Sequence, residues 1–320
     1  MNVETFNYSP ESLAPFFYLN KRDRKNIYIF STEKEALEFY NNFSNFVPEA
    51  SHFPAWDTLS YDSFTPSLEI QGKRLQTLHN LLVMESFDIA MSMKSFTQKI
   101  FINDLDVIDM QIGQEVDFEN LIENLTFLGY VNKDRVESRG TFSIRGGQID
   151  IYPLNSEYPI RIIFNGDEVV ELKLFDYITQ RSIKNIKKVL ITPSSELFQT
   201  NQEDIYKSLE IESKKDLDEY ELFQFSQNLE NFKSLLDFVP EDISINIIDF
   251  NSCKEVFSEL QKIEGDSFNN LQQFFSLNVS KMKSRYVDTL KEINKFETIF
   301  YATNDLENIS NLPQFLDGLS

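Results

Sequence analysis

The sequence predicts an α/β protein in which a three-layer domain is interrupted by a small, β-rich α+β domain. Short apolar strands alternate with amphipathic helices in the first hundred residues, and this pattern returns toward the C-terminus. Between the two parts, short strands and glycine turns follow each other closely. The middle segment also differs in charge from the rest of a chain whose formal net charge is −21.

Strand–helix units are predicted in the first part of the chain, residues 1–110. Residues 26–30 (NIYIF) form a short apolar strand, and residues 31–43 follow as a helix with an apolar stripe. Thr32 and Glu35 stand at the spacing of a capping box, in which each side chain accepts a backbone N–H of the other residue. This stretch is therefore one β-α unit.

A second helix and strand follow a turn-rich aromatic stretch at residues 53–67 (FPAWDTLSYDSFTPS). Residues 68–83 have apolar residues at helical spacing. Residues 87–93 (FDIAMSM) are almost continuously apolar, as in a parallel strand covered on both faces, and residues 95–101 begin another helix. Strands that alternate with helices favour a three-layer α/β domain.

The middle segment, residues 111–194, is predicted to be a separate β-rich unit. It begins with a helix at residues 118–130 that Gly129 ends as a C-terminal cap. Four short strands follow, separated by glycine turns at residues 145–147 (RGG) and 165–167 (NGD). The glycines are most simply interpreted as turn residues in a curled antiparallel sheet.

The last part, residues 195–320, returns to helical and acidic sequence. Residues 201–320 contain 11 Lys/Arg and 23 Asp/Glu. One strong strand is predicted at residues 243–250 (ISINIIDF), followed by a helix at residues 253–263. A final apolar strand is predicted at residues 297–305, so this part is expected to complete the α/β domain.

Charge argues against an extended nucleic-acid surface. Residues 131–190 contain ten Lys/Arg and eight Asp/Glu, a net of +2, so the other 260 residues carry −23. Acidic surfaces repel phosphate, and +2 over sixty residues is too weak for a nucleic-acid groove. The contrast marks the middle segment as a unit with a different surface.

Other classes are excluded by composition. No apolar run approaches the length of about 20 residues that spans a bilayer, and the N-terminus lacks the features of a signal peptide. A cytoplasmic protein without a membrane partner is expected. With one cysteine and two histidines, the chain has neither an internal disulfide nor a Cys/His zinc cluster. Cys253 is interpreted as an inert thiol, with a redox role as the alternative.

Two arginines of the middle segment have two possible interpretations. Arg145 lies at a glycine turn, and Arg161 begins a strand after a proline; side chains at such positions normally point to solvent. They are then ordinary surface arginines. Alternatively, they present bidentate donors to carboxylates of a protein partner, since arginine is favoured at interface hot spots. Spacing alone leaves both interpretations open.

The motifs FPAWDTLSYDSFTPS, Arg74 on the next helix, VESRGTFSIRGGQIDIYP, and YPIRIIFNGDEVVELKLFD with TQRS resemble those of a known family. The sequence is similar to the N-terminal region of the bacterial transcription-repair coupling factors (Mfd), a region that itself resembles the excision-repair protein UvrB. The resemblance is strong over residues 25 to about 195 and weak over the acidic remainder. It implies a degenerate nucleotide-motor-like (RecA/helicase-like) domain without an ATPase site, and an inserted domain that binds the excision-repair protein UvrA.

The family's partner-binding residues can be carried over to this chain. The resemblance implies that Arg145, Arg161, Phe164 and Asn165 contact UvrA. The chain departs from the family pattern at Ile163, where an acidic residue is usual, and at Asn165, where some members have an aromatic residue. The two arginines are therefore the stronger candidates.

No phosphate-binding loop is found in the sequence. Such a loop needs G-x-x-x-x-G-K-[ST] so that backbone N–H groups can converge on phosphate. The sequence has one Gly-Lys pair, Gly72-Lys73. In this pair's surroundings, Ser67 stands where the first glycine belongs and Arg74 stands where Ser/Thr belongs. No catalytic, metal or cofactor site is expected in this chain. ATP and magnesium are expected only in the motor domains of full-length family members.

Further family features are absent as well. The DNA-gripping hairpin of UvrB has no room between Tyr61 and the helix that carries Arg74. The aromatic residues Phe53, Trp56, Tyr61 and Phe64 are interpreted as core and loop packing, with a base-stacking platform as the alternative. Full-length members continue into regions that bind RNA polymerase and duplex DNA, which 320 residues cannot hold, so the chain is expected to be a fragment.

Two functions of different classes follow. The first is a non-catalytic module that recruits UvrA to stalled transcription complexes during nucleotide excision repair. The alternative is an enzyme part that contributes to ATP-dependent DNA strand separation, as UvrB does.

Overall fold

The computed structural model describes residues 2–5, 10–20, 25–58, 64–100, 102, 105–196, 233–240, 242–260, 262 and 297–302. The chain forms two compact units. Unit 1 comprises residues 1–65, 77–101 and 200–320, and unit 2 comprises residues 66–76 and 102–199. Residues 66–76, which the sequence analysis includes in the first part, thus cluster with unit 2. Most of the acidic C-terminal part predicted to be helical lies outside the described residues.

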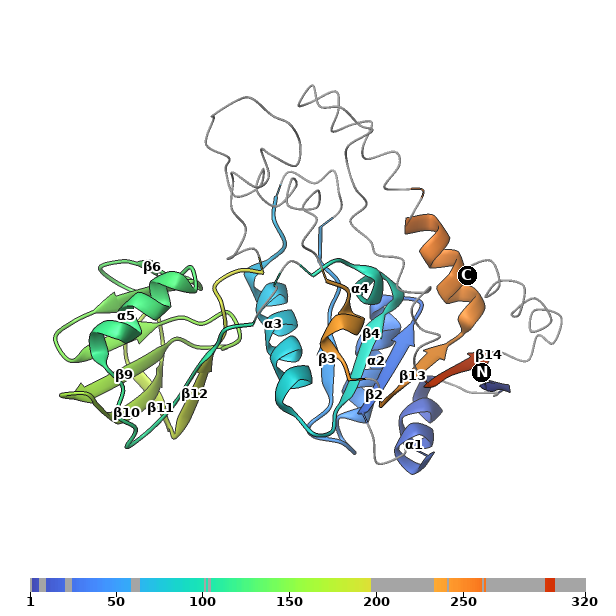
Figure 1. Cartoon of the computed structure of the whole chain (residues 1–320), viewed down its shortest axis with the longest axis horizontal. Helices are drawn as coiled ribbons and strands as arrows, with labels where there is room; N and C mark the ends of the chain where they lie inside the picture. Colours follow the sequence, from blue (N-terminus) through green and yellow to red (C-terminus); the bar gives the residue numbers. More distant parts are fainter. Residues whose placement is uncertain are drawn as a thin grey trace, which may run out of the picture. The chain divides into compact units, whose positions relative to one another are not determined.

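Unit 1 is built on a parallel sheet (Figure 1). Its strand order is β1 (Asn2–Thr5), β14 (Glu297–Ala302), β13 (Ile243–Ile248), β2 (Lys25–Phe30), β4 (Asp88–Ser92) and β3 (Ser51–Phe53). Every neighbouring pair is parallel. All residues of β4 and β13 are buried, which explains their continuous apolar sequences. The four strands predicted in this part are confirmed as β2, β4, β13 and β14.

The helices of unit 1 follow the sequence signals in part. They are α1 (Pro10–Asn20), α2 (Glu33–Phe43), the C-terminal part of α3 (Leu68–Val83), α4 (Met93–Thr97), the 3-10 helix η1 (Leu235–Phe238) and residues 250–260. The predicted capping box of α2 is confirmed: Thr32 Oγ1 accepts from the Glu35 amide at 3.2 Å, and Glu35 Oε2 accepts from the Thr32 amide at 3.1 Å. The helix predicted at residues 95–101 begins two residues earlier and ends at Thr97.

The aromatic residues of α1, α2 and β2 form the core on one side of this sheet. Phe17 packs edge-on against Tyr28 and Phe39 at ring-centroid distances of 4.8 and 5.8 Å. Phe39 and Phe43, one helical turn apart, stack at 5.0 Å. Aromatic packing of this kind holds α1 and α2 on β2.

Unit 2 contains a six-stranded sheet, a two-stranded sheet and one complete helix (Figure 1). The six strands, in order, are β11 (Ser182–Ile186), β10 (Glu168–Phe175), β9 (Ile160–Asn165), β8 (Gln148–Ile151), β7 (Thr141–Ile144) and β6 (Val131–Asn132). Neighbouring strands are antiparallel except β6 and β7. The two-stranded sheet pairs β5 (Ile108–Gln111) with β12 (Lys188–Ile191), and the helix is α5 (Phe118–Phe127).

One face of the six-stranded sheet is apolar and is covered by α5 and the β5–β12 pair. Leu121 and Leu125 of α5 belong to the same core as Ile149 and Ile162 of the sheet. Side chains alternate along a strand, so the residues between the core positions point to the opposite face. We call this opposite surface the polar face; it consists of Ser143, Arg145, Gln148, Asp150, Arg161, Ile163, Asn165, Glu171 and Lys173.

Two glycines show why this unit needs residues without a side chain. Gly146 has φ +60° in the turn between β7 and β8, a conformation that L side chains rarely adopt. Gly72 lies in α3, where an added Cβ would come within 2.1 Å of the Leu154 carbonyl oxygen. The first part of α3 therefore packs closely on the backbone at Leu154, and this packing requires the glycine of the Gly-Lys pair noticed in the sequence.

Candidate partner-binding face of unit 2

Arg145 is exposed at the turn between β7 and β8. Its amide donates to the Gln148 carbonyl at 2.9 Å, which closes the turn. Its guanidinium Nη2 donates to the Asp134 carbonyl at 2.9 Å, an interaction that orients the side chain. The prediction that Arg145 points to solvent is confirmed.

Arg161 has a different environment. It forms a fork with Asp150: Nε donates to Oδ1 and Nη2 to Oδ2, both at 2.8 Å. The Arg161 side chain is 17% exposed and the Asp150 side chain 2%. The guanidinium also lies over the Phe175 ring, 4.6 Å from its centroid. The hydrogen bonds to Asp150 raise the pKa of Arg161 above its usual value.

Of the two interpretations that the sequence left open, that of an ordinary solvated arginine is therefore wrong for Arg161. Arg161 and Asp150 are cross-strand partners in the register of β8 and β9, so their side chains stand opposite each other on the polar face. Sequence reasoning missed Asp150. The signal was an aspartate at a polar-face position of the neighbouring strand, which is visible only once the register is known.

The two residues at the tip of β9 point to opposite faces of the sheet. Phe164 is buried in the core and meets Phe118 of α5 edge-on at 5.1 Å between ring centroids. It turns inward because it is in phase with the buried Ile160 and Ile162. Asn165 is exposed at the start of the two-residue turn to β10. Of the four residues that the family resemblance implies, Arg145, Arg161 and Asn165 share the polar face, and Phe164 lies beneath it.

Unit 1 has its topological switch point between β2 and β13. From β2 the chain continues to β3 and β4 on one side, and β13 and β14 lie on the other. In open parallel sheets, ligands bind at the carboxyl ends of the strands on either side of such a point. The residues that follow β2 and β13 here include Glu33, Glu35 and Asp249. This edge therefore carries carboxylates of the protein itself.

Glu33 is held in place at this edge by three groups. Its carboxylate lies 3.1 Å from His52 Nε2, accepts from Ser92 Oγ at 2.7 Å and accepts from the Ala55 amide at 3.2 Å. Burial alone would raise the pKa of Glu33, but the hydrogen bonds from His52 and Ser92 outweigh it and lower the pKa. An ionised carboxylate thus occupies the first turn of α2, next to the N-terminus where a phosphate would gain most from the helix dipole.

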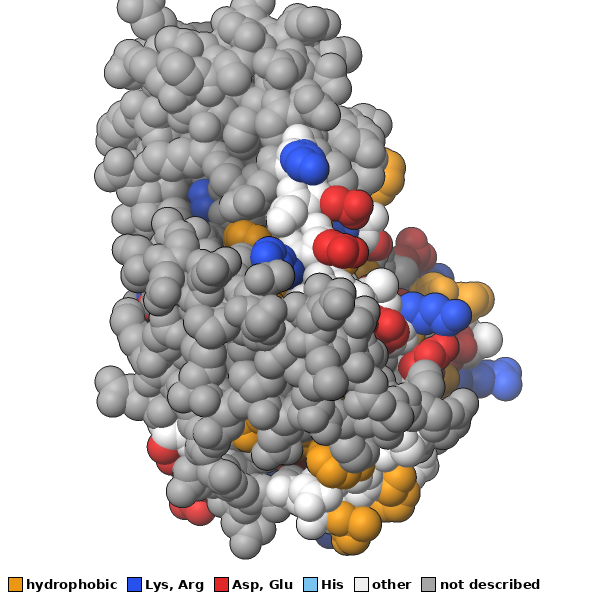
Figure 2. All heavy atoms as spheres, turned by 90° about the vertical axis from the view of Figure 1, so that its right-hand side faces the viewer, with side chains coloured by type: hydrophobic (Ala, Val, Ile, Leu, Met, Phe, Trp, Pro, Cys, Tyr) orange, Lys and Arg blue, Asp and Glu red, His pale blue; other side chains and the backbone are white. Residues whose placement is uncertain are grey.

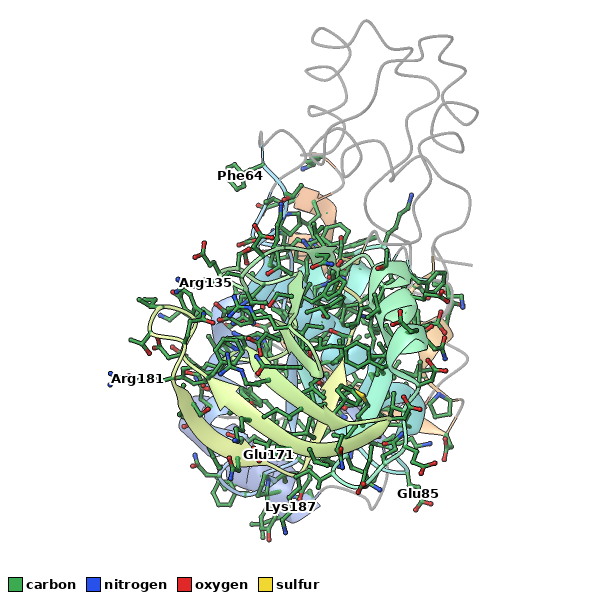
Figure 3. The ribbon with its side chains drawn as sticks, turned by 90° about the vertical axis from the view of Figure 1, so that its left-hand side faces the viewer. Phe64, Glu85, Arg135, Glu171, Arg181 and Lys187 are labelled. Atoms are coloured by element: carbon green, nitrogen blue, oxygen red, sulfur yellow. The ribbon has the colours of Figure 1, made fainter. Side chains whose placement is uncertain are left out.

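The aromatic residues after β3 are mostly core residues. Phe53 and Trp56 are fully buried, so the interpretation as packing is confirmed for them and neither can stack on a base. Phe64 is exposed, which contradicts that interpretation at this position (Figure 3). Tyr61 lies outside the described residues. Figure 2 views the molecule from the right-hand side of Figure 1, and acidic and basic side chains are intermixed among its coloured residues.

The remaining candidates are structural. Cys253 is buried, and burial raises the pKa of its thiol, as expected for an inert core cysteine. Within the part of the chain that the structure describes, no group of three or more His, Cys, Asp or Glu side chains could hold a metal ion. In that same part, every helix is too short or too polar to cross a membrane.

Comparison with known proteins first defines the class of unit 2. Residues 108–197 match the family described as the UvrB interaction domain. This range runs from the start of β5 past the end of β12, so it includes the whole polar face.

The wider comparison includes transcription-repair-coupling factors of several bacteria. The chain is similar to the transcription-repair-coupling factor of Escherichia coli K12, with 29% identity over 168 residues, 51% of this chain and 14% of that protein. The protein of the same name from Mycobacterium tuberculosis is 30% identical over 142 residues, 42% of this chain and 12% of that protein. The one from Staphylococcus aureus MRSA252 is 26% identical over 268 residues, 74% of this chain and 22% of that protein.

These matches confirm the resemblance to the transcription-repair coupling factors that the sequence motifs predict. The chain spans between 12% and 22% of the length of these three relatives.

Proposed function

We propose that this chain is a recruitment module of a transcription-repair coupling factor, and that unit 2 binds the excision-repair protein UvrA through its polar face. Through this contact the module brings excision repair to stalled transcription complexes. The match of residues 108–197 to the UvrB interaction domain and the similarity to coupling factors support the proposal. Contacts with RNA polymerase and duplex DNA belong to other regions of full-length coupling factors.

The observation that carries the proposal is the environment of Arg145. Its guanidinium is exposed on a tight turn and is oriented by one hydrogen bond to a backbone carbonyl. A guanidinium has five N–H donors, so the remaining donors can form a bidentate contact with a carboxylate. Asn165 is exposed on the same face, and the buried Phe164 holds that tip in place. Arg161 lies on the same face, where its guanidinium is already paired with Asp150.

We further infer that the chain has no catalytic role of its own and that unit 1 does not bind ATP. The carboxylates of Glu33, Glu35 and Asp249 at the switch point support this inference, because they repel a triphosphate where parallel sheets bind nucleotides. Glu35 also accepts a hydrogen bond from the backbone amide of the N-cap residue Thr32. That amide is therefore not available to a bound phosphate. No observation favours the alternative of a strand-separating enzyme part.

Arg145→Ala is expected to weaken binding of UvrA about five- to thirtyfold, or about 1–2 kcal/mol. The melting temperature should stay within the small range of surface substitutions, because Arg145 is exposed and makes one side-chain hydrogen bond. Calorimetric titration with purified UvrA measures the first quantity and a thermal melt the second. Lys187→Ala, another exposed cation of unit 2 that lies off the polar face, is the control (Figure 3). Wild-type affinity in Arg145→Ala would contradict the proposed interface.

Millimolar Mg-ATP is expected to leave the melting temperature of this chain unchanged. A ligand that binds only the native state raises its stability, so a shift would reveal an intact nucleotide site. The same preparation should show no ATP hydrolysis with or without duplex DNA. A DNA-stimulated rate above the buffer blank would favour the enzyme alternative.

A further inference from the structure

Two apolar side chains are exposed on the loop between β10 and β11, residues 176–181. Ile178 is 68% exposed and Tyr177 is 38% exposed. This loop is in contact with the polar face, because Arg161 Nη1 donates to the Gln180 carbonyl at 3.5 Å. The Tyr177 ring lies 5.9 Å from that of Tyr152. Exposed apolar residues therefore adjoin the surface that carries the arginines.

The 176–181 loop is fixed by its own hydrogen bonds. Asp176 Oδ1 accepts the amides of Ile178 and Thr179 at 3.0 and 2.6 Å. Arg135 Nη2 donates to the carbonyls of Tyr177 and Ile178 at 3.2 and 2.7 Å. A loop that is already ordered loses little conformational entropy when a partner binds. Ile178 is thus presented to solvent in one defined position.

Arginines lie beside these apolar side chains, and one of them, Arg135, is 3.5 Å from the Glu137 carboxylate. Arg135 and Arg181 are both exposed, and they lie at the same margin of the sheet in Figure 3. Arg139 lies over the Tyr152 ring, 5.0 Å from its centroid. An apolar centre with a rim of guanidinium groups complements an apolar pocket that is bordered by carboxylates.

The polar face itself lacks an exposed apolar anchor. Phe164 is buried, and Ile163, the one apolar residue of the face, is only partly exposed. Protein interfaces usually derive most of their binding energy from a few well-packed aromatic or apolar anchors and arginines. Tyr177 and Ile178 can supply this contribution.

We propose that the 176–181 loop is a second anchor of the same interface, and that Ile178 and Tyr177 enter an apolar pocket bordered by acidic residues on UvrA. This inference rests on the proposed function. It extends the interface from Arg145, across Arg161, to the loop between β10 and β11. It also assigns the exposed Arg135 and Arg181 to the carboxylates at the edge of that pocket.

The test compares Ile178→Ala, Ile178→Asp and Tyr177→Ala with the wild-type chain in calorimetric titrations with UvrA. Ile178→Asp should weaken binding about tenfold or more, and each alanine variant about threefold or more, because an apolar anchor is lost. The melting temperatures of the Ile178 variants should match the wild type, since Ile178 is mostly exposed. Phe127→Asp is the matched control: Phe127 is 63% exposed and lies on α5, which packs on the opposite face of the sheet.

Each outcome separates this inference from the proposed function. If Arg145→Ala loses affinity but the Ile178 and Tyr177 variants do not, the second anchor is refuted and the proposed function stands. If the wild-type chain does not bind UvrA, both the second anchor and the proposed function are refuted. Sedimentation of the free chain tests a second copy as the occupant: a dimer that Ile178→Asp abolishes would overturn the assignment to UvrA.

Discussion

Replacing Arg74 by methionine is expected to lower the free energy of unfolding of unit 2 by about 3–5 kcal/mol. Arg74 Nε donates to Glu196 Oε1 at 2.7 Å, and the two side chains are 0% and 2% exposed. Without the guanidinium, the Glu196 carboxylate stays buried and loses the charge that balances it, and this desolvation accounts for most of the loss. Urea denaturation, with hydrogen exchange of the β7–β10 amides to report on unit 2, measures the effect.

The neighbouring residue of α3 offers a matched control. Lys73 Nζ also lies 2.7 Å from a carboxylate, Glu69 Oε1, but both side chains are more than half exposed. Lys73→Met should therefore change the stability by about 0.5 kcal/mol or less. The double variant Arg74→Met with Glu196→Leu should recover a large part of the loss, because neither charge of the pair is then left buried. Equal effects of Arg74→Met and Lys73→Met would show that burial does not govern this pair.

Arg161→Ala is expected to lower the stability of unit 2 by about 2–4 kcal/mol in addition to weakening the binding of UvrA. The reason is Asp150, a carboxylate that is 2% exposed and loses both hydrogen bonds of the fork. Arg161→Lys keeps the charge but cannot form the fork, so it should lie between wild type and Arg161→Ala. Binding must be measured at a temperature at which circular dichroism shows each variant to be folded.

Arg145→Ala is the internal control for this second prediction. Both arginines lie on the polar face, yet of the two only Arg161 has a buried ionic partner, so only its removal should affect folding. Removing Asp150 together with Arg161 should restore part of the stability, since the unpaired carboxylate is then gone. An unchanged free energy of unfolding in Arg161→Ala would mean that the fork contributes nothing to the stability of unit 2. Arg161 would then behave as an ordinary surface arginine.

Local signals were sufficient for most secondary structure. The capping box of Thr32 and Glu35, the apolar runs of β4 and β13 and the Asn165-Gly166 hairpin signal each act within a few residues, and the structure has all of them. The sequence also indicated the segment with the UvrB interaction domain and the exposure of Arg145. It missed the helix α1 and the strands β1, β3, β5, β6, β11 and β12, most of which are short and carry weaker patterns.

The amino-acid sequence was enough to predict the longer elements and the glycine turns, because propensity, alternation and turn chemistry are local properties. Its motifs also carried the resemblance to the coupling factors. Tertiary structure decided the rest. The partner of Arg74 is 122 residues away, and Gly72 is required by a backbone that only folding brings near it. Arg161 meets Asp150 through the register of two strands, and the same register turns Phe164 inward. Which charges are buried and which apolar side chains stay exposed depends on such non-local contacts, so only the folded chain distinguishes an arginine that stabilises unit 2 from one that is available to bind a partner.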